Sequence, residues 1–379
     1  MNIGMTTFGS DGGRSGIGRY TINLVEQFSQ LAHTTNFDLY TFKDESHIFH
    51  RSPGRMRSQL FSNRLRSPLW NISWHQTRLA SWCRRLKHDV LFLPAGNRRL
   101  PARAPCPTVG TVHDFSSLHV TGKYDPARMF YIKQVLPFLV RRLSHVLTVS
   151  ESSKRDIVEY ANIAPERVTV TPLGVDHQKY RIDPVMASAR LRRQHDLAQP
   201  FLLYVSRIEH PGKNHVRLIE AFEQLKSKTQ IPHQLVLAGG DWSGAEVVRE
   251  LAAKSRFADQ ILFTGFVPDD QLLDLYVCAD VMVFPSLYEG FGLPVLEAMT
   301  SGIPVACANM SSLPEVAGDA ASYFCPYSSE DIADAVGKLL FDTRFREQCV
   351  TRGIRRASAY TWKKTAKQTL DVLKAVSES

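Results

Sequence analysis

Val281-Met282-Val283-Phe284 is followed, after four intervening residues, by Glu289-Gly290-Phe291-Gly292-Leu293-Pro294-Val295-Leu296-Glu297. The first run is short and wholly apolar, as is typical of a buried strand in a parallel sheet. The second run opens a helix, because proline is favoured in the first helical turn. Two glycines in the connecting loop let backbone N–H groups approach a ligand closely. The segment therefore predicts a strand–loop–helix unit of an α/β fold.

The same loop has the features of a site for a phosphorylated sugar. A helix N-terminus offers unpaired N–H donors and partial positive charge, which suits phosphate. Glu289 and Glu297 lie on either side of that position and could accept hydrogen bonds from sugar hydroxyl groups. An acidic residue near a helix start is common for dipole reasons alone, so the prediction rests on the whole block and not on Glu297.

Other apolar runs extend this pattern along the chain. Strands are predicted at residues 3–8, 90–93, 109–112, 146–149, 168–170, 201–205, 234–238, 261–263, 281–284 and 304–306. Helix-like segments separate them, which indicates parallel, doubly wound sheets. We expect an α/β protein of two tandem Rossmann-like domains that face a central cleft. The expected parts are a domain at 1–176, a charged linker at 177–199, a domain at 200–360 and a helix at 361–379 that crosses the domain junction.

Composition narrows the class of protein. A hydrophobic content of 44% in 379 residues is typical of a soluble two-domain protein. No apolar run is long enough to span a bilayer, and the N-terminus does not resemble a secretory signal. The six cysteines are scattered without metal-binding spacing, which favours reduced thiols. We expect a cytoplasmic protein, with peripheral attachment to the inner face of the plasma membrane left open.

Residues 46–88 contain nine Arg or Lys and no Asp or Glu. Such asymmetry indicates an anionic partner. Trp70, Trp74 and Trp82 lie in the same stretch, and aromatic residues beside basic ones are typical of docking on an anionic membrane. A helix pair that packs its tryptophans inward is the other interpretation. Nucleic acid is disfavoured, because the tryptophans fall in helix-like segments rather than on a stacking platform.

Two cations follow the predicted strand at 201–205. Arg207 would lie at the strand end and Lys213 at the start of the next helix, so both would point into the same cleft mouth. A guanidinium and an ammonium group there suit a diphosphate that gains charge as it departs. The alternative is a solvated basic turn, and the presence of the Glu289 block favours the diphosphate.

The first predicted strand leads into Gly9-Ser10-Asp11-Gly12-Gly13-Arg14-Ser15-Gly16-Ile17-Gly18. This loop is similar to a dinucleotide-binding turn, but its spacing does not complete the fingerprint and no acidic residue follows at the expected offset. A nicotinamide oxidoreductase is therefore disfavoured, and a loop that faces phosphate is favoured. His113 ends the predicted strand at 109–112 and would face the cleft as well.

Taken together, these segments resemble the glycosyltransferases of family 4, which have the two-domain GT-B fold, over essentially the whole chain. The resemblance is carried by the glycine loop at 12–18, Val112-His113-Asp114, Val149-Ser150-Glu151-Ser152, Pro172-Leu173-Gly174-Val175-Asp176, Ser206-Arg207 with Lys213-Asn214, Phe263-Thr264-Gly265-Phe266-Val267, and the 289–297 block. The stretch Gly16-Ile17-Gly18-Arg19-Tyr20 is similar to that of members that use GDP-mannose or related sugars.

The resemblance implies roles for the matching residues. Glu289 would bind hydroxyls of the transferred sugar, Glu297 would bind the ribose, and Arg207 with Lys213 would clamp the diphosphate. The other implied donor contacts are Gly12, Gly13 and Gly16 over the diphosphate, Gly290, Phe291, Gly292 and Leu293 at sugar and phosphate, and Phe266, Val267 and Asp269 beside the base. His113 would contact the sugar near its reacting centre. The catalytic candidates are thus His113, Glu289, Arg207 and Lys213.

The implied activity is transfer of a hexose, with mannose from GDP-mannose as the first choice, to a lipid-linked or polysaccharide acceptor in bacterial envelope synthesis. The resemblance implies that the domain at 1–176 binds the acceptor and the domain at 200–360 binds the nucleotide sugar. The family retains anomeric configuration, and the leaving phosphate would help to take the acceptor's proton. The chain has no Asp-any-Asp triplet, so we expect neither a metal nor another cofactor. A sugar-nucleotide epimerase on the same fold and a non-catalytic sugar-nucleotide-binding subunit are the alternatives.

Overall fold

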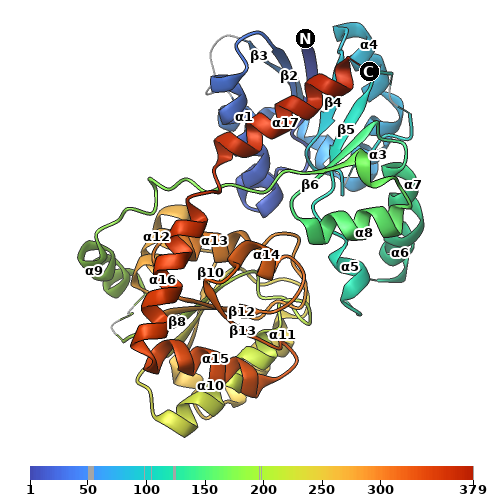
Figure 1. Ribbon diagram of the computed structural model, residues 1–379. Coiled ribbons are helices and arrows are strands. Elements are labelled where there is room, and N and C mark those ends of the chain that lie inside the picture. The colour runs from blue at the N-terminus through green and yellow to red at the C-terminus, as the bar shows by residue number, and fades with distance from the viewer. Residues whose placement is uncertain are drawn as a thin grey trace. The chain divides into compact units, whose positions relative to one another are not determined.

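Two parallel sheets organise the chain in the computed structural model, which describes residues 1–49, 55–97, 99–103, 105–122, 125–195, 197 and 199–378. The strand orders are β3-β2-β1-β4-β5-β6-β7 and β10-β9-β8-β11-β12-β13 (Figure 1). In each sheet the chain begins at an inner strand, β1 or β8, and adds the next two strands on one side of it. The later strands then follow on the other side, which defines a doubly wound sheet. The predicted pair of Rossmann-like domains is therefore confirmed.

The strands are short and mostly buried. Those of the first sheet are β1 (Asn2–Thr6), β2 (Asn36–Phe42), β3 (Met56–Phe61), β4 (Val90–Leu93), β5 (Thr108–Thr111), β6 (His145–Thr148) and β7 (Val168–Val170). Those of the second are β8 (Phe201–Val205), β9 (Gln234–Ala238), β10 (Ile261–Gly265), β11 (Val281–Phe284), β12 (Val305–Ala308) and β13 (Ala321–Phe324).

The chain divides into two units. The first contains Met1–Leu118, Tyr124–Gly174 and Thr361–Ser379, and the second contains His119–Lys123 and Val175–Tyr360. The last segment thus returns to the first unit. Residues 177–199, expected as a linker, include the helix α9 (Pro184–His195). This helix packs on α12 (Asp269–Cys278), where Arg190 forms an ion pair with Asp274 at 2.5 Å.

Helices cover both faces of the first sheet. They are α1 (Gly16–Leu31), α2 (Ser46–Phe49), α3 (Pro68–Thr77), α4 (Leu79–Leu86), α5 (Ser116–His119), α6 (Pro126–Phe130), α7 (Leu136–Val140), α8 (Glu151–Ala161) and α17 (Trp362–Ser377), with the shorter turns η1 (Asp11–Gly13), η2 (Lys43–Glu45), η3 (Asn63–Arg66), η4 (Tyr131–Val135) and η5 (Pro165–Arg167). On one face Phe28 of α1 stacks on Phe37 of β2, and α17 packs against α1. On the other face Phe8, Phe42 and Trp74 form an aromatic core with α3.

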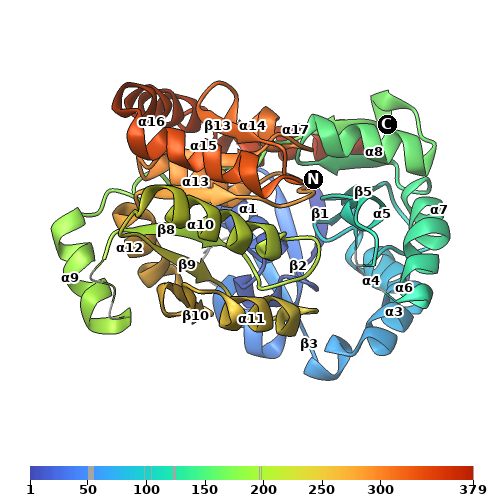
Figure 2. The same ribbon diagram turned by 90° about the horizontal axis from the view of Figure 1, so that it is seen from below.

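The second sheet is covered in the same way. Its remaining helices are α10 (His215–Thr229), α11 (Ala245–Lys254), α13 (Leu293–Thr300), α14 (Leu313–Ala317), α15 (Ser329–Phe341) and α16 (Thr343–Ala357), with the turn η6 (Ala258–Gln260). Figure 1 places α10 and α15 on one side of this sheet and α12 and α13 on the other. Helices α10 and α15 lie side by side in Figure 2 and pack against each other. Buried strands between two helical layers explain the fully apolar run at residues 281–284.

Candidate functional site

The second sheet reverses its winding between β8 and β11, which are neighbouring strands. Ligands of open α/β sheets bind outside the carboxyl ends of the strands at such a switch point. The loop at 206–214 follows β8, and the loop at 285–292 follows β11. The topology therefore places Lys213 and Glu289 on adjoining loops, although they are far apart in the sequence.

The side chain of Asn214 ties these loops together. Its Nδ2 donates to the backbone oxygens of Pro285 at 3.0 Å and Pro326 at 2.7 Å, and the residue is 2% exposed. Its φ of +59° is in the left-handed region, which asparagine adopts more readily than most residues. Asn214 thus ends the first loop, begins α10 and fixes the second loop through one side chain.

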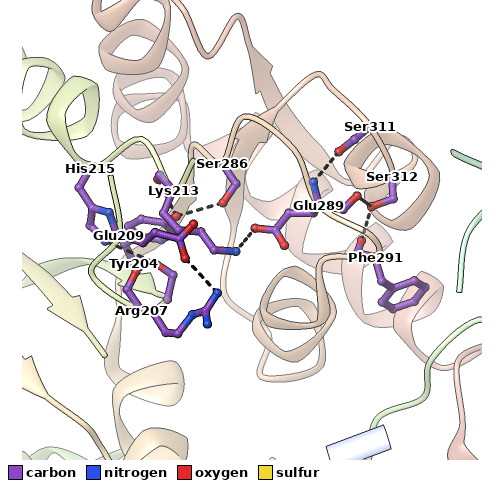
Figure 3. A network of polar contacts seen from close by, with 11 residues as sticks. Tyr204, Arg207, Glu209, Lys213, His215, Ser286, Glu289, Phe291, Ser311 and Ser312 are labelled. Carbon is purple, nitrogen blue, oxygen red and sulfur yellow. Dashed lines mark hydrogen bonds and ion pairs between the residues drawn. The ribbon is translucent and has the colours of Figure 1, made fainter. Parts of the chain in front are cut away.

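Tyr204 of β8 also holds the two loops together. Its hydroxyl donates to the backbone oxygen of Lys213 at 2.8 Å and lies 3.1 Å from Oγ of Ser286. Burial, followed by the nearby charge of Glu289, raises the pKa of this phenol. The hydroxyl therefore stays neutral and acts as a fixed donor under the two loops (Figure 3).

Lys213 and Glu289 are in direct contact. The Nζ atom of Lys213 lies 2.5 Å from Oε1 of Glu289, and the side chains are only 18% and 16% exposed (Figure 3). Partial burial weakens screening by salt, so this pair interacts more strongly than a surface ion pair. The structure thus brings together the cation predicted for the diphosphate and the carboxylate predicted for the sugar.

Two serines hold the backbone around Glu289. The N–H of Glu289 donates to Oγ of Ser311 at 3.0 Å. The hydroxyl of Ser312 donates to the backbone oxygens of Glu289 at 2.9 Å and Phe291 at 2.8 Å (Figure 3). These bonds come from the loop after β12. They fix the position of the Glu289 side chain independently of the ion pair.

The glycines after Glu289 bring the backbone to the helix start. Gly292 has a φ of +97°, and a Cβ atom at this position would lie 2.6 Å from Cδ2 of Leu313. It directly precedes Leu293, the first residue of α13, and no side chain caps that helix. The helix therefore begins one residue before Pro294, the start predicted from the sequence. As predicted, glycine backbone without side chains leads directly to the helix N-terminus.

Glu297 lies inside α13 and is 4% exposed. Its Oε2 accepts a hydrogen bond of 2.8 Å from the hydroxyl of Tyr276, a fully buried residue of α12. The carboxylate is therefore oriented by a donor that the sequence did not identify. A role at the ribose remains a prediction.

Arg207 is held by two neighbours. Its Nη2 donates to Oε2 of Glu209 at 2.9 Å, and its guanidinium carbon lies 4.8 Å from the ring centroid of Trp242. Glu209 is 2% exposed, whereas Trp242 is 53% exposed. Neither residue was identified from the sequence, although Glu209 lies in the same motif. Trp242 lies shortly after Gly239-Gly240, which follow β9. This glycine pair at the end of a strand is the feature of the sequence that could have indicated a ligand-binding loop here.

The predicted base-side residues lie after β10. Phe266 is 64% exposed, Val267 is buried, and Asp269 is the first residue of α12. Gly239 and Gly265 form a bridge, and a Cβ atom on Gly240 would touch Cβ of Phe266 at 4.0 Å. The loop that carries Trp242 and the loop that carries Phe266 therefore adjoin and present two exposed aromatic rings.

In the first unit, the glycine loop folds onto α1. Gly12 and Gly13 have φ values of +62° and +87°, and Gly16 is the first residue of α1. Ser15 caps this helix by accepting from the N–H of Gly18 at 3.2 Å. A Cβ atom on Gly18 would lie 2.0 Å from the backbone oxygen of Ser10. The glycines therefore allow a turn in which backbone N–H groups meet a helix N-terminus.

His113 follows β5 and is 7% exposed. Its ring nitrogen Nε2 lies 2.8 Å from the backbone oxygen of Pro94, and its backbone N–H donates to Oδ1 of Asn97 at 2.6 Å. Tyr20 of α1 meets the imidazole edge-on at 4.9 Å. Since Pro94 offers only an acceptor, Nε2 is the protonated nitrogen and the histidine orientation is fixed.

The basic stretch at 46–88 is divided between packing and exposure. Trp74 is buried and Trp82 partly buried in the aromatic core, as the inward-packing interpretation expects, whereas Trp70 is 64% exposed. Arg66 forms ion pairs with Asp44 at 2.7 Å and Glu45 at 3.0 Å. Arg51 lies outside the described residues. Only part of the stretch is therefore available to a partner.

Three further observations concern the described residues as a group. Among them, no set of three or more His, Cys, Asp or Glu side chains is placed to hold a metal ion. None of the helices within these ranges is long and apolar enough to cross a membrane. All six cysteines are free thiols.

Two family models match successive parts of the chain. Residues 14–179 match the family model described as Glycosyltransferase Family 4, and residues 188–356 match the model Glycosyl transferases group 1. The chain is 29% identical over 368 residues to O-antigen chain mannosyltransferase B of Escherichia coli, covering 95% of this chain and 96% of the relative. It is 32% identical over 283 residues to the serotype-specific mannosyltransferase WbdA of Escherichia coli, covering 73% of this chain but 34% of that relative's length.

Solved structures agree on the fold. The chain superposes on HepE of Anabaena, determined with UDP and glucose, with a TM-score of 0.78 at 18% identity, covering 99% of this chain and 100% of the other. It also superposes on WaaG, a glycosyltransferase involved in lipopolysaccharide biosynthesis, with a TM-score of 0.70 at 16% identity, covering 98% and 99%.

Proposed function

The chain belongs to family 4 of the glycosyltransferases, and on this premise we propose that it moves a hexose from a nucleoside-diphosphate sugar to a glycan or lipid-linked acceptor with retention of configuration. The observation that carries this proposal is the contact between Lys213 and Glu289 at the switch point of the second sheet. Because the two side chains touch, a ligand that contacts both must carry a phosphate for Lys213 and a sugar for Glu289, as a nucleoside-diphosphate sugar does.

The donor of this proposal is GDP-mannose. Two relatives are named as mannosyltransferases, one of them over nearly the whole length of both chains. The glycine loop at residues 16–20 is also similar to that of members that use GDP-sugars. Envelope polysaccharide, the O-antigen type in particular, is the proposed product, because one relative is named O-antigen chain mannosyltransferase B.

Each site residue has a part in this reaction. Lys213 and Arg207 stabilise the charge that collects on the departing diphosphate. Glu289 orients the hexose through its hydroxyl groups, and backbone groups at Gly290 to Leu293 hold sugar and phosphate. His113 contacts the sugar near its reacting carbon. The departing phosphate oxygen takes the acceptor's proton, so the reaction needs neither a protein nucleophile nor a metal.

A donor screen tests the proposal. GDP-mannose, UDP-glucose and UDP-N-acetylglucosamine are added to the full chain, and the shift in melting temperature and the slow hydrolysis of each donor are measured. GDP-mannose is expected to stabilise the protein most, since ligands that bind only the folded state raise its stability. Activity without acceptor that yields an epimerised donor would favour an epimerase. Binding without any turnover would favour a non-catalytic subunit.

Two chemical details need their own measurements. The anomeric configuration of the product, read by NMR, is expected to match that of the donor. Turnover in excess EDTA is expected to equal turnover with added magnesium or manganese. An inverted product or a strict metal requirement would contradict these parts of the proposal.

We also propose that α3 docks on an anionic membrane. Leu69 and Trp70 of this helix are 80% and 64% exposed, and Ile72 is 41% exposed. Apolar side chains at the surface of a basic segment suit insertion among acidic headgroups. Ala102 links this helix to the surface beside α7. Its backbone N–H donates to Oε1 of Gln76 on α3, and its backbone oxygen accepts a hydrogen bond from Arg142, which follows α7. Phe138 is exposed on that neighbouring surface, where its ring lies under the guanidinium group of Arg142.

Liposome flotation tests the membrane proposal. The full chain is expected to float with vesicles that contain phosphatidylglycerol and to stay behind with neutral vesicles or at high salt. Trp70→Ser should reduce flotation. Trp242→Ser removes another exposed tryptophan from the second unit and should leave flotation unchanged. Equal flotation with neutral vesicles would exclude the anionic surface.

A further inference from the structure

The contact between Lys213 and Glu289 has an electrostatic consequence for any phosphate that enters the site. The ammonium group already donates to a carboxylate at 2.5 Å, and both groups are largely shielded from water. A phosphate that binds Lys213 must therefore share its charge with Glu289. At the same time it meets the negative charge of the carboxylate, and like charges at close range repel one another.

We infer that Glu289 makes the site discriminate against the free nucleoside diphosphate in favour of the nucleoside-diphosphate sugar, by competing with the terminal phosphate for Lys213. The inference rests on the proposed function, because it assumes that these two residues face the donor. It adds a selective role to Glu289 beyond contact with the sugar.

The two ligands differ in what they offer to Glu289. An ionised carboxylate can only accept hydrogen bonds. The sugar of the donor presents hydroxyl donors, which satisfy the carboxylate when Lys213 turns toward phosphate. The free diphosphate presents no hydroxyl at that position and carries an additional ionisable oxygen in place of the sugar ester. The carboxylate therefore gains a partner from the donor and only repulsion from the diphosphate.

The surrounding bonds keep Glu289 in this role. Its backbone N–H is bound to Ser311 and its backbone oxygen to Ser312. The backbone oxygen of Lys213 is bound to the buried hydroxyl of Tyr204. Because both backbones are anchored by bonds that do not involve the ion pair, a ligand cannot relieve the competition simply by displacing one loop.

The competition matters most after transfer. The bond between the anomeric carbon and the phosphate oxygen breaks, the oxygen keeps the electron pair and takes the acceptor's proton, and the anomeric carbon bonds to the acceptor oxygen. The glycosylated acceptor carries the hydroxyl groups away. The carboxylate of Glu289 then returns to its ion pair with Lys213, so it reclaims the ammonium and weakens the hold on the diphosphate. Glu289 thereby favours product release.

Isothermal titration of the full chain tests this inference. Wild type and Glu289→Gln are titrated with GDP and GDP-mannose, and with UDP and UDP-glucose. The glutamine variant lacks the charge but keeps the shape. It is expected to bind the matching diphosphate about five- to tenfold more tightly than wild type, a typical coupling between adjoining groups. It should bind the nucleotide sugar more weakly. An unchanged or weaker affinity for the diphosphate overturns the inference.

Glu330→Gln is the charge control. Glu330 is an exposed carboxylate of α15 that pairs with Lys228 at 3.4 Å and has no part in the proposed donor site. Its removal should leave the affinity for the diphosphate unchanged. Equal tightening in both variants would reduce the effect to net charge and overturn the inference. If Glu289→Gln does not fold, Glu289→Ala carries the same test. If wild type binds none of the four ligands, the proposed donor itself is overturned. The failure of the proposed function can therefore be told apart from the failure of the inference about Glu289.

Discussion

The Nζ atom of Lys213 lies 2.5 Å from Oε1 of Glu289, although 76 positions separate the two residues in the sequence. The contact follows from topology, because Lys213 lies in the loop after β8 and Glu289 lies in the loop after the neighbouring strand β11. Asn214 and Tyr204 then fix the distance between the loops. The pair is therefore a product of the winding of the sheet and not of either motif alone.

Replacing Lys213 with alanine should lower kcat/KM for the donor about ten- to a hundredfold. A lost hydrogen bond to a charged group is worth roughly 1.5–3 kcal/mol, and each 1.4 kcal/mol is about a factor of ten in rate. Initial rates at limiting donor provide the measurement. Lys228→Ala removes a 55% exposed lysine of α10 that pairs with Glu330, and it should behave as wild type. Unchanged kinetics in Lys213→Ala would exclude it from the diphosphate clamp.

Asn214 allows its backbone and side-chain roles to be separated. Asn214→Gly keeps the left-handed φ of +59° and loses the hydrogen bonds to Pro285 and Pro326, together with the one that Arg217 donates to Oδ1 at 3.0 Å. This loss should raise the donor KM and cost about 2 kcal/mol of stability. Asn214→Ala loses the same bonds and adds the strain of a left-handed alanine, about 1 kcal/mol more. Urea unfolding of both variants measures the difference. Equal stability of the two would show that the φ angle is unimportant here.

Trp242 should act as a positioning residue for Arg207. A cation over an exposed aromatic face is worth about 0.5–1 kcal/mol, so Trp242→Leu should raise the donor KM about two- to fivefold with a smaller change in kcat. Trp242→Phe keeps an aromatic face and should restore part of the affinity. Trp70→Leu is the control, since Trp70 lies on α3 of the first unit. A KM for Trp242→Phe no better than for Trp242→Leu would contradict the role of the ring.

Buried His75 should make the first unit sensitive to acid. It is 1% exposed, and burial lowers its pKa from 6.5 to about 4. Between these pH values the unfolded chain binds a proton that the folded chain does not, so stability is full above pH 6.5 and falls with decreasing pH until about 4. The slope is at most about 1.4 kcal/mol per pH unit for one histidine.

Melting temperatures of wild type and His75→Phe between pH 7.5 and 4.5 check this expectation. Phenylalanine should fit beside Phe8 and Trp74, whose rings lie 5.8 and 5.1 Å from the imidazole. The variant should lose less stability than wild type on acidification. His33→Asn alters an exposed histidine and should follow wild type. Parallel pH profiles for His75→Phe and wild type would show that His75 is not the sensor.

Strand prediction from the sequence worked where a strand is a continuous apolar run and failed where polar residues interrupt the run or the run is too short. The expected strands at 201–205, 234–238 and 281–284 coincide with β8, β9 and β11, because fully buried strands are continuous apolar runs. β2, β3 and β13 were not predicted. β3 is an edge strand with the sequence Met-Arg-Ser-Gln-Leu-Phe, and most of its residues face water at least in part. Its polar residues conceal the strand signal.

For the site, the motifs predicted that Lys213 and Glu289 share one edge of the sheet, and their contact agrees with this. The supporting residues were not predictable in the same way. Trp242, Ser311 and Tyr276 belong to three different segments, and each acts through a contact set by strand order and loop conformation. A sequence pattern specifies neighbours along the chain, whereas these partners are neighbours only after folding.

The last helix of the chain, α17, has a consequence for biosynthesis and for engineering. It belongs to the first unit, packs on α1, and bonds back to that unit through Thr365, whose hydroxyl donates to the backbone oxygen of Pro172 at 2.6 Å. Residues 1–174 leave the ribosome long before this helix emerges, so the first unit cannot complete its apolar core until residues 362–377 have been synthesised. Chimeras that exchange acceptor specificity between relatives should therefore graft residues 361–379 together with the N-terminal half.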